Sequence, residues 1–359
     1  DSSSGPSSED RAPQSESPPN ILFLFPDQHR YDWLPGGRDH VPVRMPNLRR
    51  LAARGVRFDR AYCGSPLCAP SRACLASGQE YDRCEVPYHG TPYPLDKTTF
   101  YELLQDAGYH TMGCGKFDLD KAHQRWGIDG THWIEEWGFS AGINSPGKWD
   151  AVYDGEPKDP YNAYLQERGW RKVHYADMER RRDEPMLDPE SWGHYEATHA
   201  TDLPERAYSD NYAAQNGLRL IDEAPADRPW FLQINFPGPH EPMDVTHRMH
   251  TEASRYGARY PEPFRSSQLT PEHHQRIRRN YSAMCENIDR WLGIYEDALR
   301  RRGEWEHTIV VYSSDHGEML GDRDRWAKKV PHEASVGVPL VMAGPGIRSG
   351  DGVQDALVS

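Results

Sequence analysis

The sequence has no apolar stretch long enough to cross a membrane, since none approaches the roughly eighteen consecutive apolar residues that a spanning helix requires. It also lacks an excess of basic charge, because 42 Lys and Arg residues face 55 Asp and Glu residues and leave a formal net charge of −13. An acidic chain of this kind is unsuited to general binding of nucleic acid or of an anionic membrane surface. We therefore expect no membrane span and no nucleic-acid partner, and any site for an anion must be a local basic pocket.

The sequence also lacks a cysteine pattern typical of a metal site, and its first residues lack hydrophobic periodicity. The six cysteines do not follow the spacing of a zinc site, and the sequence assigns them no disulfide pairing. Residues 1–19 are rich in Ser, Pro and Glu without hydrophobic periodicity, which predicts a disordered leader or linker. The absence of an initiator Met indicates that a signal peptide or a tag has been removed, and with a signal peptide as the removed segment we expect a periplasmic or extracellular protein.

Short apolar runs alternate with helix-like segments through residues 20–359, a length that suits one large α/β domain. Buried strands are predicted at 21–25, 56–62, 109–115, 230–236, 307–312 and 338–342. Helices are predicted at 45–54, 68–78, 98–107, 205–221 and 271–303. This alternation predicts a mostly parallel sheet with helices on both faces.

Polar side chains directly follow four of the predicted strands. Taken one by one, such residues are often turn formers, helix caps or surface side chains. Ligands of open α/β sheets, however, bind at the carboxyl ends of the strands. The pattern therefore predicts one site assembled from several strand ends, and its residues are Asp27 with Gln28, Lys116, His240, and Asp315 with His316.

Cys68 opens the helix that ends at Gly78, and Arg72 lies one turn further on. Backbone N–H groups and the positive end of the helix dipole favour negative charge at such a position, and a thiolate there is reactive. The planar fork of Arg72 can hold an anion at the same point. For an arbitrary cysteine, burial under the start of a helix would be the simpler interpretation.

The Cys-x-Pro-Ser-Arg motif at 68–72, followed by Leu75 and Gly78, resembles the signature of the type I, formylglycine-dependent sulfatases. The likeness runs from about Asn20 to the end of the chain. It implies the alkaline-phosphatase-like fold, an α/β sandwich in which a smaller C-terminal sheet would follow the present chain. Other segments that resemble motifs of this family, in the same order, are 108–116, the Pro-His-x-Pro sequence at 239–242, 313–317, and Trp326-x-Lys328 with Glu333 and 338–340.

In that family a maturation enzyme oxidises the motif cysteine to formylglycine, and the hydrated aldehyde attacks a sulfate ester beside a divalent cation, usually Ca²⁺. The resemblance implies this modification, the maturation enzyme as a partner, and Ca²⁺, with Mg²⁺ or Mn²⁺ as other cations that fit. The implied substrate is a small-molecule or oligosaccharide sulfate ester. The implied catalytic residues are Cys68, Arg72, Lys116, His240, Asp315 and Lys328, and the implied metal ligands are Asp27, Gln28, Cys68, Asp315 and His316.

Two positions depart from the family pattern. Many members have a second Asp where this chain has Gln28, whose amide oxygen can bind a hard cation but brings no charge. The family usually has His two residues after the motif lysine, where this chain has Asp118. Three alternatives for Asp118 stay open: it pairs with Lys116, contacts the substrate or turns away.

The segment 127–204 shows weak periodicity and is rich in Trp, Tyr, Arg and Pro. Either it packs on the scaffold through its aromatic residues, or it forms a wall of the substrate pocket, where loops commonly set specificity. Its composition favours a carbohydrate sulfate over a steroid or small aryl sulfate. The run Arg180–Arg182 is expected on a solvated face.

The sequence therefore predicts a sulfuric ester hydrolase that acts on a sulfated carbohydrate or an aryl sulfate. Two alternatives stay open. One is a phosphodiesterase or phosphonate monoester hydrolase of the same superfamily, because a metal, a nucleophile and a basic clamp also serve phosphoryl transfer. The other is a non-catalytic glycan-binding relative in which Cys68 keeps its thiol.

Overall fold

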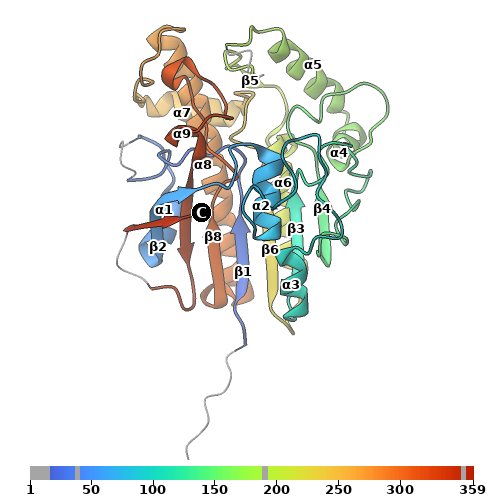
Figure 1. The fold of residues 1–359 in the computed structure, drawn as a ribbon. Coiled ribbons are helices and arrows are strands. Elements are labelled where there is room, and N and C mark those ends of the chain that lie inside the picture. Colours follow the sequence, from blue (N-terminus) through green and yellow to red (C-terminus); the bar gives the residue numbers. More distant parts are fainter. Residues whose placement is uncertain (1–16, 37–40, 188–192, 349–352) are drawn as a thin grey trace, which may run out of the picture.

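The computed structural model describes residues 17–36, 41–187, 193–348 and 353–359, and a sheet of eight strands forms its centre (Figure 1). The strands lie in the order β10-β2-β9-β8-β1-β6-β3-β4. Strand β9 runs antiparallel to β2 and β8, whereas the other neighbouring strands are parallel, so the prediction of a mostly parallel sheet is confirmed. The strands are β1 (Asn20–Leu24), β2 (Val56–Tyr62), β3 (His110–Gly115), β4 (Ala141–Asn144), β6 (Trp230–Asn235), β8 (Thr308–Tyr312), β9 (Gly337–Ala343) and β10 (Val353–Val358).

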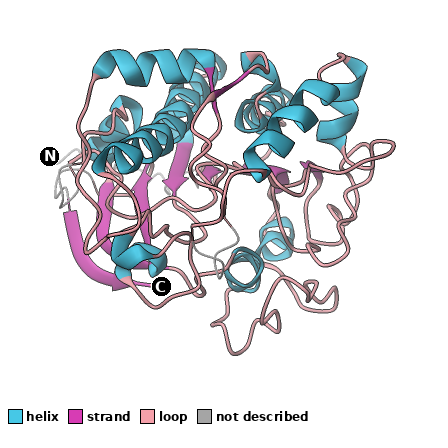
Figure 2. Cartoon of the chain, turned by 90° about the horizontal axis from the view of Figure 1, so that it is seen from above, coloured by secondary structure: helices cyan, strands magenta, loops and turns pink. Residues whose placement is uncertain are grey.

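Helices cover both faces of the sheet, as predicted (Figures 1 and 2). Thr99 caps one of them by accepting a hydrogen bond from the backbone N–H of Glu102, and Gly303 ends another with φ of 74°. Helices α1 (Pro46–Arg54), α6 (Ser209–Glu223) and α8 (Pro271–Arg302) pack on one face, and α2 (Cys68–Ser77) and α3 (Phe100–Asp106) pack on the other.

Strand β1 shows how the core divides between the two faces. Successive side chains of a strand point to opposite sides. Leu22 and Leu24 therefore belong to the cluster under α6 and α8, and Phe23 and Phe25 belong to the cluster under α2 and α3. Burial on both faces explains why this strand is an unbroken apolar run in the sequence. The apolar run ends at the carboxyl end of β1, and Asp27 follows it.

The segment 127–204 contributes an edge strand that the sequence did not predict. Strand β4 has four residues and pairs in parallel with β3. Its Ala-Gly-Ile-Asn sequence has little strand propensity, so the pairing with β3 determines its conformation. The described residues of the segment that come after β4 lie beyond the carboxyl ends of the strands (Figure 1). They include α4 (Pro160–Glu167), α5 (Arg171–Arg182) and β5 (Ala200–Thr201), and β5 pairs with β7 (Val245–Thr246).

One expectation for this segment is wrong. Arg181 is buried and its Nε lies 3.1 Å from Oδ2 of Asp177, so the run Arg180–Arg182 is not a wholly solvated face. Residues 1–16 of the predicted leader lie outside the described residues. Within the described part of the chain, no helix combines the length and the apolar character that crossing a bilayer would need. The remaining short elements are α7 (His247–Tyr256), α9 (Glu333–Val336) and the 3₁₀ helices Glu205–Ala207, Trp305–His307 and Asp322–Asp324.

Candidate active site

Four strand ends and the start of one helix meet at one edge of the sheet (Figure 1). This is the arrangement that the sequence predicts, since the carboxyl ends of parallel strands share an edge. The side chains involved are largely removed from solvent. They are Asp27 after β1, Lys116 after β3, His240 after β6, Asp315 after β8, and Cys68 as the first residue of α2.

Cys68 is 1% exposed, and its Sγ atom faces three of the other residues. Sγ lies 3.1 Å from Nε2 of His316, and it lies 3.7 Å from both Oδ1 of Asp27 and Nζ of Lys116. As the first residue of α2, Cys68 lies where backbone N–H groups have no partner inside the helix, which favours a negative group. The reactive atom of this residue therefore lies between an acidic cluster and a lysine.

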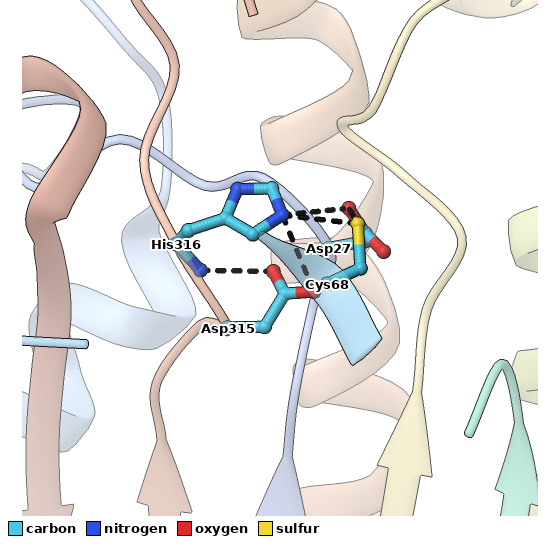
Figure 3. Close-up of side chains that lie close together, drawn as sticks. All are labelled: Asp27, Cys68, Asp315 and His316. Atoms are coloured by element: carbon cyan, nitrogen blue, oxygen red, sulfur yellow. Dashed lines mark hydrogen bonds and ion pairs between the residues drawn. The ribbon is translucent and has the colours of Figure 1, made fainter. Parts of the chain in front are cut away.

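The acidic cluster has the composition of a metal site. Ligand atoms of Asp27, Cys68, Asp315 and His316 all lie within 4.8 Å of one another, and all four residues are buried (Figure 3). Carboxylate oxygens suit a hard divalent cation. Nδ1 of His316 lies 3.0 Å from the carbonyl oxygen of Gly317, a contact that turns Nε2 toward the cluster. Burial lowers the pKa of His316, which keeps the imidazole neutral as a ligand must be. The residues present therefore fit a divalent cation.

Gln28 lies beside this cluster but its side chain contacts other groups. Its backbone N–H donates to Oδ1 of Asp315 at 2.9 Å. Its Oε1 accepts a hydrogen bond from Nζ of Lys328, and its Nε2 donates to the carboxylate of Glu318. The amide thus links the metal cluster to the loop that carries Lys328, and a role for Gln28 as a metal ligand stays a prediction.

Arg72 binds protein groups in this site. It is 3% exposed, its Nε donates to Oδ2 of Asp315 at 2.9 Å, and its Nη2 lies 3.2 Å from Oδ2 of Asp27. Its Nη1 donates to the backbone carbonyl of Lys116 and to Oδ1 of Asn235. Because the guanidinium connects the ends of β1, β3, β6 and β8, the geometry gives Arg72 a positioning role rather than direct contact with an anion.

Lys116 has two carboxylate partners. Its Nζ lies 2.5 Å from Oδ2 of Asp27 and 3.3 Å from Oδ2 of Asp118. Burial alone lowers the pKa of Lys116, but Asp118 and Asp27 raise it well above its ordinary value, so the ammonium stays charged. Asp118 also lies 3.2 Å from Nζ of Lys121. Of the three alternatives for Asp118, the structure thus selects pairing with Lys116, and it adds a second lysine that the sequence did not single out.

His240 and Lys328 face each other across the same space. Nε2 of His240 lies 2.7 Å from Nζ of Lys328, and Nδ1 lies 2.7 Å from a carboxylate oxygen of Glu241. Burial lowers the pKa of His240, but the carboxylate of Glu241 outweighs it, so the net shift is upward. The two nitrogens therefore share a hydrogen bond, and the pair places a nitrogen-bound proton at the cavity.

Glu318 is a site residue that the sequence analysis missed. Its Oε1 accepts hydrogen bonds from the backbone N–H groups of Leu320 and Ala327, both at 2.8 Å, and Tyr195 donates to its Oε2 at 2.8 Å. Burial raises its pKa. These bonds hold the loop that leads to Lys328. The only sequence signal was its position three residues after Asp315, and no periodicity marks it.

A cavity of about 460 Å³ opens over these residues. Cys68, Lys116, His240 and Lys328 line one part of it, which is strongly basic. Among the described residues of 127–204, Trp149 is the one tryptophan that lines it, so this segment does form a wall of the pocket. The other side chains around the opening include His89, Lys121, Asp150, Arg182, His194, Glu241 and Lys329.

A family model described as Sulfatase matches residues 19–359. The chain belongs to the sulfatase family. It is 28% identical to the choline-sulfatase of Rhizobium meliloti, over 92% of this chain and 64% of that protein. It is 26% identical to an arylsulfatase of Clostridium perfringens, over 91% of this chain and 69% of that protein. The chain thus spans about two thirds of the length of these curated relatives.

The fold is that of the alkaline-phosphatase-like enzymes. The structure of a phosphonate monoester hydrolase from Agrobacterium radiobacter superimposes on this chain with a TM-score of 0.73 and 24% sequence identity, over 94% of this chain and 71% of the other. At that identity the likeness concerns the architecture alone. The sandwich predicted from the motifs is confirmed by this match and by the order of the strands.

Proposed function

We propose that this sulfatase hydrolyses sulfate esters, with position 68 as the nucleophile after conversion of Cys68 to formylglycine. The observation that carries the proposal is the location of Cys68. Its side chain lies at the start of α2, within 3.7 Å of Lys116 and 3.1 Å of His316, and it lines the basic cavity. A nucleophile, a metal cluster and a cationic clamp thus meet at one point.

The cavity suits the sulfate group of such an ester. Lys116 and Lys328 line it as buried ammonium groups whose pKa values are raised, because Asp27 and other charged neighbours outweigh the effect of burial. Two fixed cations in a site with little water stabilise negative charge that spreads over sulfate oxygens. They also orient the ester so that its sulfur faces position 68.

The two sides of the site divide the proton transfers. Asp315 lies next to position 68 and takes a proton from one hydroxyl of the hydrated formylglycine, and the resulting oxygen attacks the sulfur. His240, with Lys328 2.7 Å away, protonates the departing oxygen. The second hydroxyl then expels sulfate and restores the aldehyde. A divalent cation held by Asp27, Asp315, His316 and position 68, with Gln28 beside it, would supply Lewis-acid charge stabilisation; Ca²⁺ is the ion proposed, and Mg²⁺ or Mn²⁺ also fit.

Conversion of Cys68 requires a maturation enzyme as a partner. Because the thiol is 1% exposed in the folded chain, we infer that this enzyme acts before folding is complete. Export to the periplasm or the extracellular space stays a prediction, and comparing the protein in secreted and cytoplasmic fractions of its host tests it.

The proposal is tested with protein produced together with a maturation enzyme. Mass spectrometry after treatment with an aldehyde-trapping reagent should detect an aldehyde on the peptide that contains position 68. Turnover of 4-nitrophenyl sulfate should exceed that of 4-nitrophenyl phenylphosphonate. Cys68→Ala should reduce the sulfate activity by roughly 10³-fold or more, whereas Cys63→Ala, a matched half-buried cysteine outside the cluster, should retain it.

Three results would contradict the proposal. Unchanged turnover in Cys68→Ala would remove position 68 from the chemistry. A trapped aldehyde with faster turnover of the phosphonate would assign the site to phosphonate esters instead. An intact thiol, in protein made with a maturation enzyme that converts a control substrate, would favour the glycan-binding alternative.

A further inference from the structure

One side of the cavity lies next to Lys116 and Lys328 but takes no part in the chemistry proposed above. His89, Lys121, Trp149 and Asp150 form it, and we call these four residues the lateral wall. Trp149 and Asp150 come from the segment that follows β4, while Lys121 follows the end of β3. Because the sulfate group faces Lys116 and Lys328, the lateral wall is placed to meet the rest of the substrate.

A lysine and a carboxylate lie side by side in this wall. Nζ of Lys121 lies 2.7 Å from Oδ2 of Asp150 and 3.2 Å from Oδ2 of Asp118. The two carboxylates balance the ammonium, so the lateral wall carries no excess of positive charge. What it offers is a strong hydrogen-bond donor next to a strong acceptor, at fixed positions.

Two nitrogen atoms of the lateral wall have no partner. Nδ1 of His89 and Nε1 of Trp149 are buried, and neither has a hydrogen-bond partner among the described residues. Burial and then the charge of Lys121 lower the pKa of His89 to about 2, so its imidazole is neutral. Buried polar groups without partners cost free energy and are uncommon in folded proteins. A ligand that carries hydroxyl groups would satisfy both.

Other surroundings keep the indole of Trp149 in place. The guanidinium of Arg182 lies 5.6 Å from its ring centroid, and the ring of His194 lies 5.5 Å from it. A rigid aromatic ring beside a charged donor–acceptor pair is suited to a sugar, which has both an apolar face and hydroxyl groups.

The same features disfavour two other leaving groups. A quaternary ammonium group is best held by aromatic faces and negative charge, but the guanidinium of Arg182 already lies 5.6 Å from the ring centroid of Trp149 and Lys121 lines the same cavity. An apolar aryl group would remove water from the Lys121–Asp150 pair without replacing its hydrogen bonds, which is unfavourable.

We propose that the lateral wall binds hydroxyl groups of a sugar, so that the substrate is a sulfated carbohydrate. This inference rests on the proposed function and names its substrate class. Asp150 accepts from one sugar hydroxyl, Lys121 donates to its neighbour, and the indole N–H of Trp149 donates to a third. These residues determine specificity, and they do not act on the sulfur.

Two substitutions test the lateral wall, and they remove different numbers of its polar groups. Trp149→Phe keeps an aromatic ring and removes only the N–H donor. Asp150→Ala removes the acceptor and the main partner of Lys121. The substrates are a panel of monosulfated hexoses and hexosamines, with 4-nitrophenyl sulfate and choline O-sulfate for comparison. Glu167→Gln, an exposed residue of α4 outside the cavity, is the matched control and should change no substrate's kcat/KM.

At least one sugar sulfate should have a higher kcat/KM than choline O-sulfate. Relative to 4-nitrophenyl sulfate, Trp149→Phe should lower the kcat/KM for that sugar by about fivefold, and Asp150→Ala by about tenfold or more, mostly through KM. If both variants reduce all substrates by the same factor, or if no sugar sulfate is preferred to choline O-sulfate, the inference is wrong.

Binding separates this inference from the proposed function. Calorimetry with the Cys68→Ala protein measures affinity for the same sugar sulfates without turnover. Binding that weakens about tenfold in Cys68→Ala/Asp150→Ala supports the lateral wall, even if the mature protein hydrolyses no sulfate ester. Absence of binding, or binding that Asp150→Ala leaves unchanged, overturns the inference even if 4-nitrophenyl sulfate is hydrolysed.

Discussion

Replacing Arg72 by Ala should destabilise the protein strongly, because this buried side chain connects several strand ends of the site. Its guanidinium contacts the carboxylates of Asp315 at 2.9 Å and of Asp27 at 3.2 Å, and both carboxylates are fully buried. It also donates to the backbone carbonyl of Lys116, so one residue joins the ends of three strands. Removing it takes one cationic partner away from each of two buried carboxylates.

Arg72→Ala removes a different share of the charged partners of Asp27 and of Asp315. Burial raises the pKa of Asp27, yet Lys116 lowers it more than Arg72 does, so Asp27 keeps a strong partner in the variant. Asp315 keeps two backbone N–H donors, from Gln28 and His316, but it loses the guanidinium of Arg72, which donates to its Oδ2 at 2.9 Å. Breaking a buried ion pair by removing one partner costs about 3–5 kcal/mol. The remaining partner of Asp27 places the expected loss near the lower value, about 3 kcal/mol.

Thermal and urea unfolding of the variant measure this loss. Both are carried out with a chelator present, because a bound cation would itself compensate the carboxylates. A loss of this size lowers the melting temperature by about 4 °C, because a chain of 359 residues unfolds with an entropy of about 0.75 kcal/mol/K. Arg219→Ala is the control, since its pair with Glu223 lies on the surface and such pairs contribute about 1 kcal/mol or less. If Arg72→Ala is no less stable than Arg219→Ala, the positioning role is wrong.

Two further predictions concern pH. Glu241 raises the pKa of His240 against the effect of burial, so the protonated imidazole persists to higher pH and activity is lost as pH rises through that raised value. Glu241→Gln should therefore move the alkaline limb of the kcat/KM profile toward acid, and an unmoved limb would exclude His240 as the acid. Burial lowers the pKa of His174 to about 4, so the unfolded chain binds a proton below about 6.5 that the folded chain refuses. The free energy of unfolding should therefore fall by up to about 3 kcal/mol between about pH 6.5 and 4, and urea titrations should find a flatter dependence in His174→Phe.

The sequence was sufficient for the parts of the fold that local rules determine. The strand before Asp27 is apolar on both faces, the helix after Thr99 has a capping box, and the long helix before Gly303 has an apolar stripe with a glycine stop. In each of these segments the local residues are enough to predict the conformation. The site residues were predictable for a related reason, since carboxyl ends of parallel strands lie on one edge.

Pairing between side chains was beyond the reach of the sequence. Nothing in the linear pattern indicates that Arg72 faces two carboxylates, that Glu318 holds the loop before Lys328, or that Arg181 is buried on Asp177. Strand β4 was missed because its conformation comes from its neighbour β3 rather than from its own residues. For Arg72 and β4 the decisive partner lies far away in the sequence, whereas Asp177 lies one turn before Arg181 on the same face of α5.

The family usually has His where this chain has Asp118, and the charges of the neighbouring lysines explain how a carboxylate fits there. A carboxylate in place of a neutral imidazole adds one negative charge beside Lys116, where Asp27 is already present. Lys121, 3.2 Å from Asp118, returns the positive charge, so the pair leaves the balance around the sulfate clamp unchanged. The same lysine then pairs with Asp150 at 2.7 Å and reaches the cavity. Asp118 thus connects Lys116 at the sulfate end of the cavity with Lys121 on the lateral wall, which is why we propose a positioning role for Asp118 and a role in substrate recognition for Lys121.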